Sequence, residues 1–184
     1  SSATAGRLAG SATTMAGTAV HAAASALSDA ALVPFRPFLP ANSVDDWGRD
    51  DHLIRALSPF ARLRWDVSVG GDQHLPKRLG ALLVTNQRHW SWSPLWVAWA
   101  LGEATDRPVR FVGRPDIAPL GAALRRLGGL LHEPHEVAGA LRHGELVVMA
   151  TSSTNHPRFA GSVDHELVGA AVTAHVAVIP VASM

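Results

Sequence analysis

Apolar and polar positions along the chain fall into blocks that predict strands followed by helices. The clearest block is the apolar run 81–84, which stops at the polar cluster 85–89. A second apolar run, 95–101, begins just after Pro94, and the three blocks predict a buried strand, a loop and a helix. Because the run 95–101 has no polar face, we expect this helix to be buried or to face a membrane. Ligands of open α/β sheets bind at the carboxyl ends of strands, so the loop after Val84 is the first place to look for a site.

The remainder of the chain continues this alternation. Further strands are expected at 65–69, 109–113, 130–131, 145–149 and 176–181. Helices are expected over 43–60, in one or two pieces interrupted at Pro59, and at 119–127, 136–142 and 164–174. Ser43 and Ser162 are expected to cap the helices that follow them. We therefore predict an α/β fold with a mostly parallel mixed sheet, flanked by helices and preceded by N-terminal helices.

The first 42 residues form a segment distinct from the predicted domain. Residues 1–33 are mainly Ala, Ser, Thr and Gly, and the prolines within 34–40 predict an extended connector. The Ala-rich part favours helix but buries little apolar area. It is expected either to order against lipid or another protein, or to be a loosely packed helix or tail. The α/β domain is expected over 43–184, and an extension of the native chain beyond Met184 stays open.

Composition narrows the classes of function. The formal net charge is +1, and no basic stripe is present, which argues against a nucleic-acid binder. Cysteine is absent, which excludes disulfides and thiolate chemistry. His132 and His135 flank Pro134, which opposes the helical zinc pattern, so no metal site is predicted. Four tryptophans lie close together in the sequence: Trp90, Trp92, Trp96 and Trp99. They are expected either to pack in the core or to form the wall of an acyl-chain tunnel or a membrane anchor.

Short motifs follow one another in a specific order over residues 65–184. They are His-Leu-Pro at 74–76, Ala-Leu-Leu-Val-Thr-Asn at 81–86, Arg-Pro-Val-Arg-Phe-Val-Gly at 107–113, Pro-Leu-Gly at 119–121, Leu-Arg-Arg-Leu-Gly-Gly at 124–129, Gly-Glu-Leu-Val-Val at 144–148 and Val-Ile-Pro-Val-Ala at 178–182. Together they resemble the glycerolipid (lysophospholipid) acyltransferase superfamily. The resemblance implies an α/β domain preceded by helices that often contact membrane. It also implies acyl transfer from acyl-coenzyme A or acyl carrier protein to a lipid hydroxyl, with no bound cofactor.

The catalytic register of that family is displaced in this chain. Family members carry an Asn-His pair after the central strand and an Asp four residues later; the His removes a proton from the acceptor hydroxyl and the Asp orients it. Here Asn86 is kept, but Gln87 or Arg88 stands at the His position. Trp92 or Ser93 stands at the Asp position. The nearby His89 is the candidate catalytic base.

A second family motif, Phe-Pro-Glu-Gly-Thr-Arg, helps to hold the acceptor phosphate and corresponds to residues 150–155. Thr154 is retained, whereas Asn155 replaces the Arg, and Arg158 or His156 could compensate for it. The candidate substrate-binding residues are therefore Asn86, Arg88, Ser93, Ser153, Thr154, Asn155 and Arg158. We expect the two loops that carry them to lie at one edge of the sheet, because parallel strands end on the same side.

Two functions stay open. One is a glycerolipid-acyltransferase-like protein of lipid metabolism that transfers or binds acyl groups. The other is a non-catalytic lipid- or partner-binding subunit of a membrane-associated complex. A carboxylate that lies beside His89 in the folded protein would distinguish the first function from the second. The expected ligand is a lipid or an acyl thioester, the expected place is the cytoplasm at the inner face of the cell membrane, and residues 1–33 are the expected contact with a complex.

Overall fold

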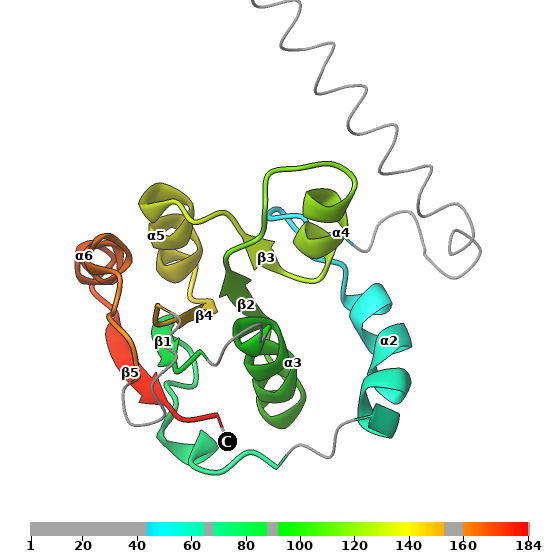
Figure 1. The fold of residues 1–184 in the computed structure, drawn as a ribbon. Coiled ribbons are helices and arrows are strands. Elements are labelled where there is room, and N and C mark those ends of the chain that lie inside the picture. The colour runs from blue at the N-terminus through cyan, green and yellow to red at the C-terminus, as the bar shows by residue number, and fades with distance from the viewer. Residues whose placement is uncertain (1–43, 65–67, 88–91, 153–159, 184) are drawn as a thin grey trace, which may run out of the picture.

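A five-stranded parallel sheet forms the centre of the fold (Figure 1). The computed structural model describes residues 44–64, 68–87, 92–152 and 160–183. In sheet order the strands are β3 (Gly129–Leu130), β2 (Val109–Val112), β4 (Leu146–Ala150), β1 (Ala81–Thr85) and β5 (Ala177–Val181). The predicted α/β fold is confirmed, but the sheet is parallel throughout these strands and not mixed. The intervening helices return the chain to the same end of the sheet before each new strand, which makes parallel pairing possible.

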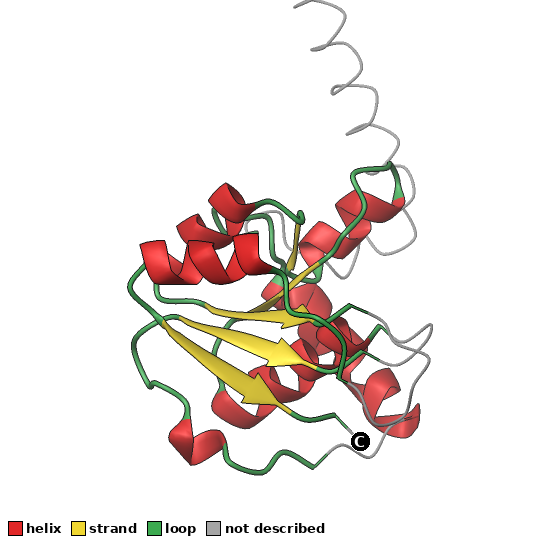
Figure 2. Ribbon diagram, turned by 60° about the vertical axis from the view of Figure 1, so that its left-hand side comes forward, coloured by secondary structure: helices red, strands yellow, loops and turns green. Residues whose placement is uncertain are grey.

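Helices cover both faces of this sheet (Figures 1 and 2). They are α2 (Asp51–Arg64), α3 (Ser93–Thr105), α4 (Leu120–Arg126), α5 (Pro134–Arg142) and α6 (His165–Thr173), with a short 3-10 helix η2 (Asp72–His74) ahead of β1. Strand β1 explains the two layers, because successive side chains of a strand point to opposite faces. Leu82 packs into the core that α5 and α6 cover. Ala81 and Leu83 pack into the core that α3 and α4 cover.

The strand register aligns the carboxyl ends of the central strands. Thr85, the last residue of β1, pairs with Ala150 of β4 on one side and with Val181 of β5 on the other. Strand β2 runs parallel to β4, with Phe111 opposite Val148. The loops that follow these strands therefore start at one edge of the sheet.

Helix α2 begins later than the sequence predicts. It starts at Asp51 and continues through Pro59 as one helix, so the predicted start at residue 43 and the predicted interruption at Pro59 are wrong. Its cap is Asp50 and not Ser43, because the Asp50 carboxylate accepts hydrogen bonds from the backbone nitrogens two and three residues further on, both at 3.1 Å. A side chain seven residues earlier cannot reach those donors.

The cap of α6 also differs from the prediction. The carboxylate of Asp164 accepts hydrogen bonds from the backbone nitrogens of Glu166 at 2.8 Å and Leu167 at 3.2 Å. Ser162 instead pairs with Ser152 across the chain, with 2.9 Å between their hydroxyl oxygens. The carboxylate of Asp164 caps the helix because it lies directly before the first turn, where two backbone nitrogens have no acceptor within the helix.

The other predicted elements agree with the structure to within two residues, except the strand at 65–69 and the helix predicted from the apolar run 95–101, which continues to Thr105. Of that range, residues 65–67 lie outside the described residues, and Ser68 and Val69 are not in a strand. The segment 1–42 and the N-terminal helices expected there also lie outside the described residues. Within the described ranges, no helix combines the length and apolar character needed to cross a membrane.

Candidate functional site

A cavity of about 570 Å³ opens at the carboxyl edge of the sheet. Residues at or just beyond the ends of β1, β2 and β4 line it, together with the starts of α3 and α6. Its volume lies within the range of roughly 300–1,000 Å³ that is usual for small-molecule sites. The cavity therefore occupies the place where an open parallel sheet ordinarily binds its ligand.

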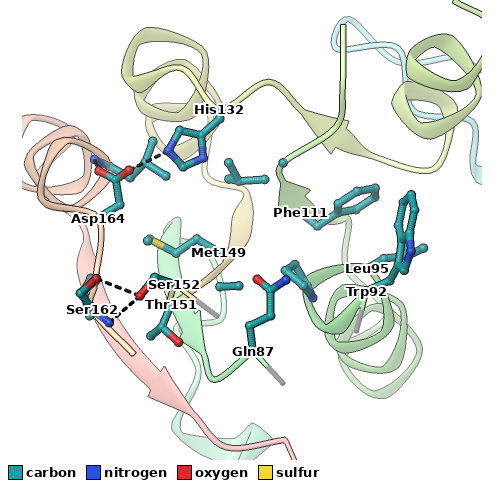
Figure 3. A pocket seen from close by; sticks show the side chains of 16 residues that line it. Gln87, Trp92, Leu95, Phe111, His132, Met149, Thr151, Ser152, Ser162 and Asp164 are labelled. Atoms are coloured by element: carbon teal, nitrogen blue, oxygen red, sulfur yellow. Dashed lines mark hydrogen bonds and ion pairs between the residues drawn. The ribbon is translucent and has the colours of Figure 1, made fainter. Parts of the chain in front are cut away.

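One wall of the cavity is apolar. Trp92 and Leu95, at the start of α3, lie beside Phe111 of β2 on this side (Figure 3). Phe111 is buried, whereas Trp92 is 47% exposed, so the wall extends from the core to the surface. Such a wall offers a ligand apolar contact worth about 25 cal/mol for each Å² that it covers.

The opposite wall is polar (Figure 3). It presents His132, just after β3, Asp164 at the start of α6, and the hydroxyls of Ser152 and Ser162. A ligand that fits both walls has an apolar part and a part that makes hydrogen bonds.

His132 and Asp164 are the closest titratable pair of the polar wall. Nε2 of His132 lies 2.6 Å from Oδ2 of Asp164. The side chain of His132 is 60% exposed and that of Asp164 is 31% exposed. The hydrogen bond from His132 is the main cause that lowers the pKa of the Asp164 carboxyl, and the backbone hydrogen bond from Leu167 lowers it further. Asp164 is therefore a carboxylate at neutral pH, held on one oxygen by helix α6 and on the other by the imidazole.

The serine pair joins the two ends of the chain segment between β4 and α6. Besides the bond between the two hydroxyls, the backbone nitrogen of Ser162 donates to Oγ of Ser152 at 2.9 Å, and the backbone nitrogen of Ser152 donates to the carbonyl of Ser162 at 2.8 Å. Next to them, the hydroxyl of Thr151 donates to the carbonyl of Ala160. These bonds hold both ends of the segment against the cavity wall.

The structure describes two of the predicted site residues. Asn86 does not line the cavity; its side chain accepts a hydrogen bond from the backbone nitrogen of Ser183 at 2.8 Å and donates to the carbonyl of Ser183 at 3.1 Å. Ser93 is 9% exposed at the first position of α3 and also lies outside the lining. Their neighbours Gln87, Trp92 and Pro94 line it instead.

The other predicted site residues lie outside the described residues: His89, Arg88, Ser153, Thr154, Asn155 and Arg158. The described residues on each side of them show where their segments attach. Gln87 and Trp92 border the first segment, Ser152 borders the second, and all three line the cavity. The two loops therefore leave from one edge of the sheet, as β1 and β4 are parallel neighbours.

Sequence reasoning missed the pairing of His132 with Asp164. It considered His132 only as a metal ligand, together with His135. The available signal was the position of both residues: His132 follows a predicted strand, and Asp164 stands at the start of a predicted helix. Their separation of 32 residues hides the contact, which depends on the order of the strands. No group of three or more metal-ligating side chains occurs within the described ranges.

The remaining tryptophans of α3 line a second cavity, of about 550 Å³, between α2 and α3. Trp96 and Trp99 both face it, and the indole nitrogen of Trp99 donates to the hydroxyl of Ser58 at 3.1 Å. Leu95 lines both cavities. Trp90 lies outside the described residues, and the other three tryptophans of the cluster are divided between the two cavities.

Comparison of the chain with protein-family models, with curated proteins and with solved structures finds no significant match.

Proposed function

We propose that this protein acts in lipid metabolism as a glycerolipid-acyltransferase-like protein and binds an acyl group in the cavity at the carboxyl edge of its sheet. The observation that carries the proposal is the division of that cavity into an apolar and a polar wall. Trp92, Leu95 and Phe111 supply apolar contact for acyl methylenes. The polar wall supplies donors and acceptors for a thioester or a lipid head group. The motif order over residues 65–184 supports the same class of ligand.

The proposed reaction is transfer of the acyl group from coenzyme A or acyl carrier protein to a lipid hydroxyl. The oxygen of the hydroxyl attacks the thioester carbonyl, and a base in the site removes its proton. His89 was the base that the sequence offered, in the segment that begins beside Gln87 at the cavity wall. The protein needs no resident cofactor for this reaction.

A second candidate function is binding without transfer. The observation that favours it is the engagement of the Asn86 side chain with Ser183, because the resemblance assigned Asn86 to the substrate. In that case the protein presents a bound lipid or acyl thioester to a partner. Under both functions we propose a peripheral position at the inner face of the cell membrane, with residues 1–33 as the contact with membrane or complex.

Titration of the full chain with a long-chain acyl-coenzyme A, followed by calorimetry, tests the proposed binding. Val163 lines the cavity between Ser162 and Asp164 in the chain, and Val163→Trp should fill part of it and weaken binding by at least about tenfold, which equals about 1.4 kcal/mol. Val172→Trp is the matched control, because Val172 is 65% exposed on α6. Equal binding by both variants, or no binding by the unchanged protein, would contradict the proposal. Binding without release of free thiol would favour the non-catalytic function.

A further inference from the structure

We propose that His132 is a catalytic base of this cavity and that Asp164 positions it. The proposal rests on the proposed function, since the proton that His132 accepts belongs to the hydroxyl of a bound lipid acceptor. It assigns the base to a histidine more than forty residues after the loop in which the motif order places it.

The hydrogen bond to Asp164 decides which nitrogen of the imidazole is free. An ionised carboxylate only accepts hydrogen bonds, so Nε2 of His132, 2.6 Å from Oδ2, carries the proton and donates it. In the neutral ring, Nδ1 then holds the lone pair. Nδ1 has no hydrogen-bond partner among the described residues, and the ring lines the cavity (Figure 3). The ring thus has the tautomer and the access that a general base requires.

Asp164 is itself held in place, which makes it a suitable orienting group. Its Oδ1 accepts the backbone hydrogen bonds of Glu166 and Leu167 at the start of α6. Rotation of the carboxylate away from His132 would therefore break the cap of a nine-residue helix. A carboxylate fixed in this way stabilises the imidazolium that forms when Nδ1 takes a proton.

The serine hydroxyls on the same wall bond to each other, and the hydrogen bond of His132 goes to Asp164. Oγ of Ser152 and Oγ of Ser162 are 2.9 Å apart and bond to each other, and Ser152 also accepts from the backbone of Ser162. The chain contains no cysteine that could carry an acyl group. We therefore assign the proton to the acceptor, in a direct transfer without an acyl-enzyme.

The reaction balances without a further reactant. The acceptor oxygen loses its proton to Nδ1 of His132 and forms a C–O bond with the thioester carbonyl carbon. The C–S bond breaks, and the leaving thiolate takes the proton back from Nδ1. The products are an ester and a free thiol, and His132 and Asp164 return to their starting states.

A purely structural role for this pair is the competing explanation, because Asp164 caps α6 whether or not His132 is present. Two variants separate the roles. His132→Gln keeps an amide donor near Asp164 but removes the base. Asp164→Asn keeps a side chain that caps helices about equally well but removes the charge that orients the ring. His135→Gln is the matched control, since His135 is exposed in the first turn of α5 and does not line the cavity.

The test measures thiol release from a long-chain acyl-coenzyme A in the presence of lysophosphatidate or glycerol-3-phosphate. The protein adds no background, because it has no cysteine. We expect His132→Gln to lower the rate by about 10²–10⁴-fold and Asp164→Asn to lower it as well, with unchanged thioester binding and an unchanged rate in His135→Gln. Nitrogen-15 NMR of the unchanged protein should show His132 as the Nε2–H tautomer, and Asp164→Asn should disturb that preference.

Three outcomes would overturn the inference. Turnover by His132→Gln at the rate of the unchanged protein would remove His132 from catalysis and leave acyl transfer at this cavity intact. Binding without thiol release by the unchanged protein would show that the pair is no catalyst, while the acyl-binding function stands. Absence of thioester binding would overturn both this inference and the proposed function.

Discussion

Arg110 in the middle of the sheet is paired with Glu145, the residue directly before β4. The guanidinium donates two hydrogen bonds to the carboxylate, one of them at 2.9 Å, and the Arg110 side chain is fully buried. A third bond reaches Asp45, which attaches the turn ahead of α2 to β2. Burial alone would lower the pKa of Arg110, but the hydrogen bonds and charges of Glu145 and then Asp45 together outweigh it and raise the pKa. Arg110 thus joins parts of the fold to one another.

We expect Arg110→Met to destabilise the protein by about 3–5 kcal/mol, because it leaves the nearly buried Glu145 without its cation. Denaturant unfolding measures the loss. Arg62→Met is the control: Arg62 also pairs with a glutamate, Glu103 at 3.0 Å, but its side chain is 68% exposed, so about 1 kcal/mol or less is expected. Equal losses in the two variants would contradict a dominant role of burial.

Asn86 and Ser183 tie the loop after β1 to the chain after β5. Asn86→Ala removes both bonds between the amide and the Ser183 backbone, and we expect a loss of about 1–3 kcal/mol. Asn86→Asp keeps the acceptor for the Ser183 nitrogen and should lose less. Hydrogen exchange at the Ser183 amide provides the measurement, with protection retained in the Asp variant and lost in the Ala variant. Full protection in Asn86→Ala would show that the tie is dispensable.

Gly161 allows the chain to approach the serine pair. Its φ is +84°, and a Cβ at this position would collide with the carbonyl oxygen of Ser152. Gly161→Ala should therefore destabilise the protein by at least about 1–2 kcal/mol. Gly169→Ala, in α6 with open space around the added carbon, should instead stabilise it by about 0.5–1 kcal/mol. Thermal unfolding of both variants tests the difference, and a shift in the same direction would refute it.

The Asp164 carboxyl makes part of the stability depend on pH. Its pKa in the folded protein is lowered below the ordinary 3.8, chiefly by the hydrogen bond from His132. A lowered folded pKa stabilises the protein above the ordinary value, and this contribution disappears as the pH falls through the folded value. The stability advantage that the unchanged protein owes to the ionised Asp164 should therefore shrink as the pH falls below about 4, and no such loss should occur in Asp164→Asn.

NMR titration of the Asp164 carboxyl checks the cause of this shift. In His132→Gln the pKa of Asp164 should move back toward its ordinary value, because the main cause of the lowering is weakened. His135→Gln should leave it in place. An Asp164 pKa that is the same in all three proteins would assign the shift to the helix cap alone.

The sequence by itself determined the succession of strands and helices. The apolar runs that became β1, β2 and β4 are short and end at polar or glycine residues, and these are local features. Gly128, just after α4, has φ at +93°, the left-handed conformation in which a glycine commonly ends a helix. Local preference also placed the loops at the carboxyl edge, because strands joined by helices run parallel.

The tertiary structure alone decided which polar side chains meet. Asn86 contacts Ser183 because β1 and β5 are neighbours in the sheet, although the two strands are far apart in the chain. His132 finds Asp164 because α6 begins on the same edge at which β3 ends. The cap of α6 also depends on the folded structure, because both Asp164 and Ser162 could cap a helix. Asp164 caps α6, and Ser162 bonds to Ser152 instead. Such pairings depend on the order of the strands in the sheet and on which side chain reaches the free backbone donors of a helix. The pattern of apolar and polar residues along the chain specifies neither of these.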